Sequence, residues 1–73
     1  MKCWICGEEL RDRERTVAID LGEHRSSGDT FYFKARLLEV HLHCLDKVDP
    51  VRFMESIRGR LRERAKRVFG GFL

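Results

Sequence analysis

The sequence predicts a small α+β domain that is stabilised by a metal ion. Candidate metal ligands stand at both ends of the first two thirds of the chain, in Cys3-Trp4-Ile5-Cys6 and His41-Leu42-His43-Cys44. Apolar residues alternate between these clusters, and a long stretch of helical periodicity follows them. At 73 residues a single core contributes little net stability, so a metal or another crosslink is expected.

The first elements are a tight turn and a strand. Cys3–Gly7 places two cysteines around two residues, and Gly7 stands where such a turn often needs a positive φ. Residues 8–14 are polar and predict a loop. In Arg15–Leu21 apolar and polar residues alternate, which indicates a strand with one buried face.

A second strand should complete a β-hairpin. Gly22–Asp29 has the composition of a hairpin loop, and Thr30–Val40 is again rich in β-forming residues. The apolar parity switches at Leu37-Leu38, which predicts a β-bulge there. We expect Arg15–Leu21 to pair with Thr30–Leu37. Trp4, Phe31 and Phe33 should then be buried in the core.

The C-terminal third predicts helices. A short helix is expected over His41–Val48, and Asp49-Pro50 then provides an N-cap followed by proline in the first turn. The long helix should run from Pro50 to about Phe69, with a possible kink at Gly59 and a C-cap at Gly70-Gly71. Its apolar seam comprises Met54, Ile57, Leu61, Ala65 and Val68, with Phe53 and Phe69 at the edges.

Charge divides the chain into two parts. The net charge is +3, but residues 1–49 carry eight Lys/Arg and ten Asp/Glu, whereas residues 50–73 carry seven Lys/Arg and two Asp/Glu. We therefore expect one domain with a zinc-binding module at 1–49 and a basic amphipathic helix at 50–73 packed on it. An acidic partner would bind the second part.

Cysteine usage indicates a reducing compartment. Three cysteines are an odd number for a closed disulfide framework, and no apolar leader precedes them. No stretch approaches the roughly 18 apolar residues that a membrane-spanning helix needs. We expect a cytoplasmic protein that is not embedded in a membrane.

The spacing of the ligands favours zinc. Zn²⁺ binds four sulfur or nitrogen donors as a tetrahedron, and a Cys-x-x-Cys turn supplies two of them from one side. A pair spaced i, i+3 at a helix start supplies the other two. Cys3, Cys6, His41 and Cys44 fit this scheme, and His43 is the alternative to His41.

The order of these elements resembles the treble-clef zinc finger group. Cys3–Cys6 corresponds to its knuckle, a hairpin follows, and His41–Cys44 corresponds to the ligand pair at its helix start. The resemblance covers residues 3 to about 48, although the segment between the ligand pairs is long for a compact finger. It implies a structural zinc more than a function, because members of the group bind nucleic acid, proteins or ligands, and a few are nucleases.

Other interpretations of the cysteines are weaker. A redox Cys-x-x-Cys normally follows a strand, and an iron–sulfur cluster would normally use a fourth cysteine. Three unligated buried cysteines are also conceivable. A catalytic zinc keeps an open coordination position, whereas four protein ligands fill the site here, so we do not expect an enzyme. His24 is interpreted as an ordinary loop residue.

The basic helix offers the candidate binding surface. Cationic residues form rows on both flanks of the apolar seam, and they are the predicted nucleic-acid-binding residues: Arg58, Arg60, Arg62, Arg64, Lys66 and Arg67. The commonest interpretation of such a pattern is a helix that packs its seam on the hairpin and exposes a solvated basic face. The pattern also suits an amphipathic helix on an anionic membrane with Phe69, Phe72 and Leu73 inserted. We favour DNA or RNA as the partner. The alternative is a protein partner, or a homodimer, on the apolar seam.

Overall fold

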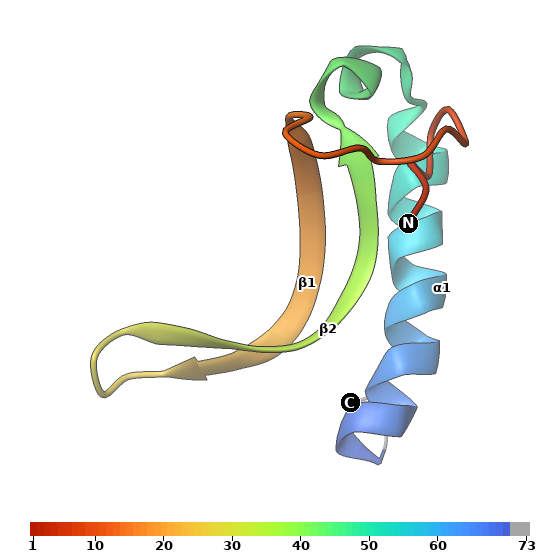
Figure 1. The fold of residues 1–73 in the computed structure, drawn as a ribbon. Helices are drawn as coiled ribbons and strands as arrows, with labels where there is room; N and C mark the ends of the chain where they lie inside the picture. Colours follow the sequence, from red (N-terminus) through yellow and green to blue (C-terminus); the bar gives the residue numbers. More distant parts are fainter. Residues whose placement is uncertain (71–73) are drawn as a thin grey trace.

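The structure, a computed structural model, describes residues 1–70. Two strands, β1 (Thr16–Arg25) and β2 (Thr30–His41), form an antiparallel hairpin, followed by the 3-10 helix η1 (Leu42–Lys47) and helix α1 (Pro50–Phe69). Figure 1 shows a curved hairpin with α1 along one side and the N-terminal segment across the end near η1. The small α+β architecture is therefore as predicted.

The hairpin is longer than the sequence suggested. Gly22–Arg25, predicted as loop, belongs to β1, and only residues 26–29 form the turn. This prediction was wrong because Gly22–Arg25 continue the pairing with Thr30–Phe33, and a partly exposed strand accommodates their polar residues as well as a loop does.

Two β-bulges bend the hairpin. Ile19 pairs with Leu38 but Asp20 pairs with Arg36, which leaves Leu37 as an extra residue in β2. This is the bulge predicted near Leu37-Leu38. A second bulge, at Lys34, was not predicted; it lies between the Leu21 and Gly22 pairings. Bulges increase local twist and bend a strand, and the distal part of the hairpin turns away from α1 (Figure 1).

The core lies between the knuckle, the proximal hairpin and α1. Its buried centre consists of Cys3, Leu38, Val40 and Cys44, so two candidate metal ligands form half of it. The Trp4 ring packs on Phe53 with centroids 5.6 Å apart. Phe31 and Phe33, expected in the core, are instead 54% and 55% exposed, because they lie on the part of the hairpin that projects from the body.

Helix α1 begins and ends as the sequence predicted. The Asp49 side chain accepts a hydrogen bond from the Val51 N–H at 3.0 Å, and Gly70 closes the helix in the left-handed region at φ 77°. The helix runs without interruption through Gly59. Gly71, the second residue of the predicted C-cap, lies outside the described residues, as do Phe72 and Leu73.

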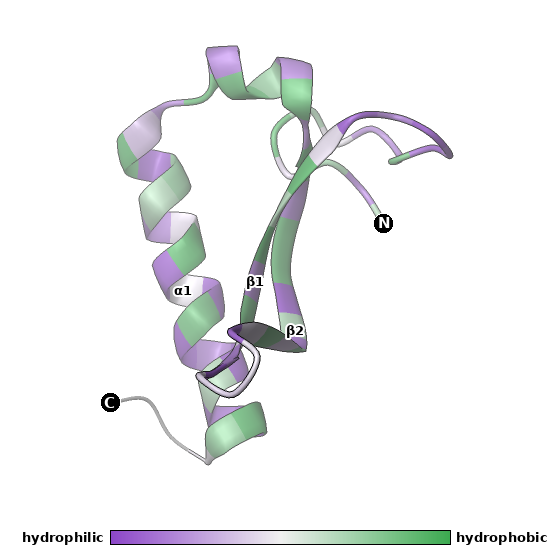
Figure 2. Cartoon of the chain, turned by 90° about the vertical axis from the view of Figure 1, so that its left-hand side faces the viewer, coloured by the Kyte–Doolittle hydropathy of each residue, from purple (hydrophilic) through white to green (hydrophobic). Residues whose placement is uncertain are grey.

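Most of the apolar seam of α1 is covered within the chain. Ala65 is buried and four seam residues are half-buried, namely Phe53, Ile57, Leu61 and Val68. Met54 and Phe69 remain 53% and 47% exposed, so these two do not belong to the packed seam. Figure 2 shows the mixture of apolar and charged residues along α1. In residues 1–70 no helix combines the length and apolarity that crossing a membrane requires.

Candidate metal centre

Four side chains converge at the end of the hairpin. The ligand atoms of Cys3, Cys6, His41 and Cys44 all lie within 4.8 Å of one another. The Nδ1 atom of His41 lies 3.4 Å from the Cys6 sulfur and 3.9 Å from the Cys44 sulfur. Three of the four residues are buried and Cys6 is exposed. This arrangement could hold a metal ion.

The knuckle presents its two sulfurs through backbone geometry. Gly7 adopts φ 77°, and its N–H donates to the Cys3 carbonyl at 2.9 Å. The N–H of Cys3 donates in turn to the Glu8 carbonyl at 2.8 Å. The left-handed conformation suits glycine at this position, and it closes the turn that directs Cys3 and Cys6 to one side.

The second ligand pair spans the junction of β2 and η1. His41 is the last residue of β2 and caps η1 with extended backbone angles, φ −62° and ψ 138°. The predicted short helix over His41–Val48 is a 3-10 helix of six residues, Leu42–Lys47. In a 3-10 helix residues three apart lie on the same side, which brings His41 and Cys44 together.

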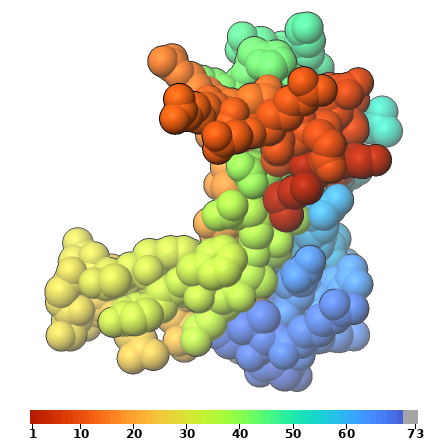
Figure 3. All heavy atoms as spheres, in the orientation of Figure 1, coloured from red at the N-terminus to blue at the C-terminus, as the bar shows by residue number. Residues whose placement is uncertain are grey.

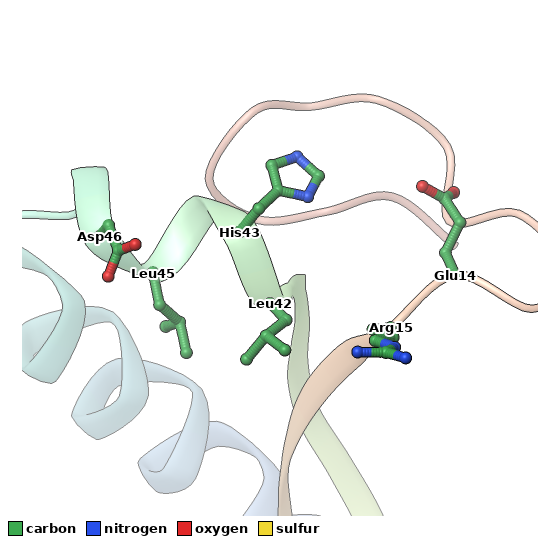
Figure 4. Close-up of a pocket in the computed structure, with 6 residues that line it drawn as sticks. All are labelled: Glu14, Arg15, Leu42, His43, Leu45 and Asp46. Atoms are coloured by element: carbon green, nitrogen blue, oxygen red, sulfur yellow. The ribbon is translucent and has the colours of Figure 1, made fainter.

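His43 lies outside the cluster. It is exposed, and its ring stacks on the His41 ring with centroids 4.9 Å apart. Figure 4 shows His43 projecting from η1 into a hollow, with Glu14 across from it and Leu42 and Leu45 pointing to the other side. Of the two candidate histidines, the geometry thus brings His41 to the three sulfurs.

Glu14 is a residue that sequence reasoning missed. Its carboxylate oxygen lies 3.0 Å from Nε2 of His41, so this nitrogen is engaged while Nδ1 faces the sulfurs. The Arg11 N–H donates to the same carboxylate at 2.6 Å, and these contacts lower the pKa of Glu14. A histidine that binds a metal usually donates its other N–H to such a carboxylate. Nothing in the polar run of residues 8–14 distinguished this glutamate beforehand.

Burial and mutual contacts shift the pKa values of three residues in the cluster. Burial opposes the Cys3 thiolate, but backbone N–H groups directed at its sulfur, that of Cys6 foremost, lower its pKa to about 6. Burial raises the pKa of the Cys44 thiol to about 11, and the neighbouring sulfurs add to the rise. Burial lowers the pKa of His41, but hydrogen bonds to the cysteines and Glu14 outweigh burial and raise it to about 9. With these pKa values Cys44 and His41 are protonated at neutral pH, and a metal ion that binds them would displace a proton from each.

The predicted nucleic-acid-binding residues lie on α1, and all six are exposed. Arg60 is not a free cation, because its Nη1 donates to the Leu37 carbonyl at 3.1 Å. Arg67 pairs with Glu63 at 3.6 Å, one helical turn away. Within residues 1–70 the remaining four make no ion pair: Arg58, Arg62, Arg64 and Lys66.

No protein-family model, curated protein or solved structure matches this chain. The function of the cluster and of the basic helix is therefore inferred from their donor atoms, burial and charge.

Proposed function

We propose that this protein is a small zinc-binding module of the treble-clef type, in which the metal is structural. The observation that carries the proposal is the convergence of three sulfurs and one imidazole nitrogen within 4.8 Å, from three buried residues and the exposed Cys6. The order of knuckle, hairpin and His-x-x-Cys turn agrees with that group. The three cysteines are free thiols, which suits a reducing compartment such as the cytoplasm.

The donor set fits zinc better than other common metals. Thiolates and imidazole select zinc over the hard cations Mg²⁺ and Ca²⁺, which prefer oxygen. With Zn–S near 2.3 Å and Zn–N near 2.0 Å, a tetrahedron has edges of roughly 3.5–3.8 Å. The separations of 3.4 and 3.9 Å between His41 Nδ1 and two sulfurs are already close to that. Four protein ligands would complete the coordination shell, so the metal has a structural role in this proposal and no open position for a substrate.

The metal should supply much of the folding free energy. Cys3 and Cys44 lie at the buried centre of the core, so a metal bound to both would join the knuckle to the end of the hairpin. Structural zinc sites of this kind contribute on the order of 10 kcal/mol. We expect one zinc per chain in purified protein, loss of dispersed amide NMR signals with EDTA, and recovery on adding ZnCl₂.

A substitution in the site should have the same effect as the chelator. Cys6→Ser should unfold the protein, whereas Ser27→Ala in the hairpin turn should retain metal content and NMR dispersion. A metal-free sample with a fully dispersed spectrum would rule out the structural role of zinc.

We further propose that the module binds nucleic acid through one row of exposed cationic residues on α1. Arg58, Arg62 and Lys66 are four residues apart, so they lie on one face of the helix. All three are exposed and unpaired among the described residues. Helix α1 as a whole carries seven Lys/Arg and two Asp/Glu, a balance that attracts phosphates.

Salt dependence tests this binding mode. Each phosphate contact contributes about 0.7–0.9 to the slope of log K against log salt concentration. Arg62→Ala with Lys66→Ala should therefore lower the slope by about 1.4–1.8 for DNA or RNA oligonucleotides. Arg13→Ala, which removes a 94% exposed cation near the N-terminus, is the matched control. Undetectable binding at low ionic strength would refute this part of the proposal.

A protein partner on the apolar seam is the second candidate, but the packing of α1 against β2 leaves it less surface. Only Met54 and Phe69 of the predicted seam remain largely exposed in the described residues.

A further inference from the structure

Gly59 lies in the middle of the side of α1 that faces away from the hairpin. It is two residues, roughly half a helical turn, from both Ile57 and Leu61, which are half-buried members of the seam. Figures 1 and 3 show the hairpin along one side of α1, with atoms of the C-terminal half of this helix, in blue, at the surface. Gly59 is exposed and is therefore directed to solvent.

Nothing in the described part of the fold requires a glycine at this position. Gly59 has ordinary helical backbone angles, so no positive φ demands it. A Cβ atom built there would meet nothing within 4 Å beyond its own neighbours in α1, so no segment of residues 1–70 packs closely against it. Glycine inside a helix costs about 1 kcal/mol relative to alanine. The close approach of another molecule would account for it.

Cationic side chains surround this glycine. Arg62 and Lys66, three and seven residues after it, lie on one side of it, whereas Glu63 and Arg67, four and eight residues after it, lie on the other. Together with Gly59 these residues line an open hollow of about 490 Å³. Glu63 is the one carboxylate among them, and it lies 3.6 Å from Arg67. The hollow therefore combines an excess of positive charge with uncovered helical backbone.

Charge decides what can approach this backbone. A glycine also allows a second helix to approach closely, but the cations of a second α1 would be repelled by those around Gly59. An anion is attracted instead, and arginine and lysine are common donors to the phosphate oxygens of nucleic acids. The hollow is thus complementary to a phosphate group.

We propose that one backbone phosphate of a bound nucleic acid sits in the hollow over Gly59, held by Arg62 and Lys66 from one side and by Arg67 from the other. This inference rests on the proposed nucleic-acid binding and names the group that is recognised. Because Gly59 has no side chain, the phosphate comes close enough to the helix for all three cations to reach it. Arg67 then exchanges Glu63 for the phosphate. A phosphate contact reads no base, so this site contributes affinity without sequence preference.

Filling the hollow tests the inference without changing a charge. Gly59→Gln in the zinc-loaded protein should weaken binding to DNA and RNA oligonucleotides by about 10-fold, which corresponds to the loss of one charge-assisted hydrogen bond. The slope of log K against log salt concentration should fall by about 0.7–0.9, the contribution of one phosphate. Glutamine is a better helix former than glycine, so thermal unfolding should find this variant at least as stable as the wild type. Val51→Gln introduces the same side chain at a 66% exposed position of α1 and should bind as the wild type does.

A second pair of variants tests the role of Glu63. Glu63→Gln removes the carboxylate that competes with the phosphate for Arg67 and should tighten binding. Glu55→Gln makes the same change of charge at another exposed position of α1, outside the hollow. Glu63→Gln should bind about 2- to 5-fold more tightly than Glu55→Gln, because only Glu63 is paired with a cation of the hollow.

The outcomes separate this inference from the function on which it rests. Absence of wild-type binding overturns both. If Arg62→Ala with Lys66→Ala weakens binding but Gly59→Gln binds as the wild type does, only the phosphate site over Gly59 is overturned. An equal loss of affinity in Val51→Gln, or equal affinities of the two glutamate variants, also overturns it. So does equally tight binding of a polyglutamate of the same charge as the oligonucleotide, since the hollow would then recognise acidic proteins.

Discussion

Nε2 of His41 lies 3.0 Å from a carboxylate oxygen of Glu14, and its Nδ1 faces the three sulfurs. This contact fixes the ring orientation and places a negative charge behind it. Glu14 belongs to the loop before β1, so the contact joins the knuckle side of the fold to the end of β2. The loop before β1 is therefore connected to the candidate ligand His41 through the Glu14 side chain.

Glu14→Gln should weaken zinc binding by about 10- to 100-fold, because the imidazole loses the carboxylate that orients it and raises its basicity. Competition with a chromophoric chelator measures the affinity. Asp12→Asn, which alters a 99% exposed carboxylate of the same loop, is the control and should leave the affinity unchanged. Equal affinities of Glu14→Gln and wild type would mean that the contact does not tune the metal ligand.

Zinc binding should release protons at pH 7. The raised pKa values of His41, about 9, and of Cys44, about 11, mean that both groups carry a proton in the metal-free site. Both protons must leave when the metal binds, so affinity should rise with pH from 7 to 9. Below about pH 6 the Cys3 thiolate also becomes protonated, and the fall in affinity should steepen.

Calorimetric titration in buffers of different ionisation enthalpy counts these protons. We expect at least two per zinc at pH 7, one from His41 and one from Cys44. A binding enthalpy that does not vary with the buffer would contradict the protonation states assigned to the metal-free cluster.

The sequence was most informative where local chemistry determines structure. The bounds of α1 were predicted because Asp49, Pro50 and Gly70 each act on adjacent backbone groups. Each pair of candidate ligands, Cys3 with Cys6 and His41 with Cys44, was recognised because its own spacing acts over three residues. The bulge at Leu37 was visible as a change of parity along one strand.

The sequence was least informative where distant segments meet. Glu14 lies far from His41 along the chain, and nothing local distinguishes it from the other acidic residues of its loop. Phe31 and Phe33 were expected in the core because apolar residues usually are, but the bulges turn the distal part of the hairpin away from α1. Arg60 looked like one more surface cation, although it donates to the carbonyl at the bulge.

That hydrogen bond separates Arg60 from its neighbours on α1. Arg60→Ala should lower the free energy of unfolding by about 0.5–1.5 kcal/mol, because the Leu37 carbonyl loses its donor. Arg62→Ala, on the exposed side, should change it by less than about 0.5 kcal/mol. Urea denaturation of the zinc-loaded proteins measures both. Equal effects of the two substitutions would show that the contact with Leu37 contributes nothing.

Two glycines should respond to alanine in opposite directions. At Gly22 a Cβ would collide with the Tyr32 carbonyl oxygen and the Phe31 ring, so Gly22→Ala should destabilise the protein by about 1–3 kcal/mol. At Gly59 the space beside α1 is open, and Gly59→Ala should stabilise by about 0.5–1 kcal/mol through its effect on backbone entropy. Thermal unfolding of the zinc-loaded variants gives the sign of each change. If Gly22→Ala were as stable as Gly59→Ala, the Phe31 ring could not be seated across Gly22.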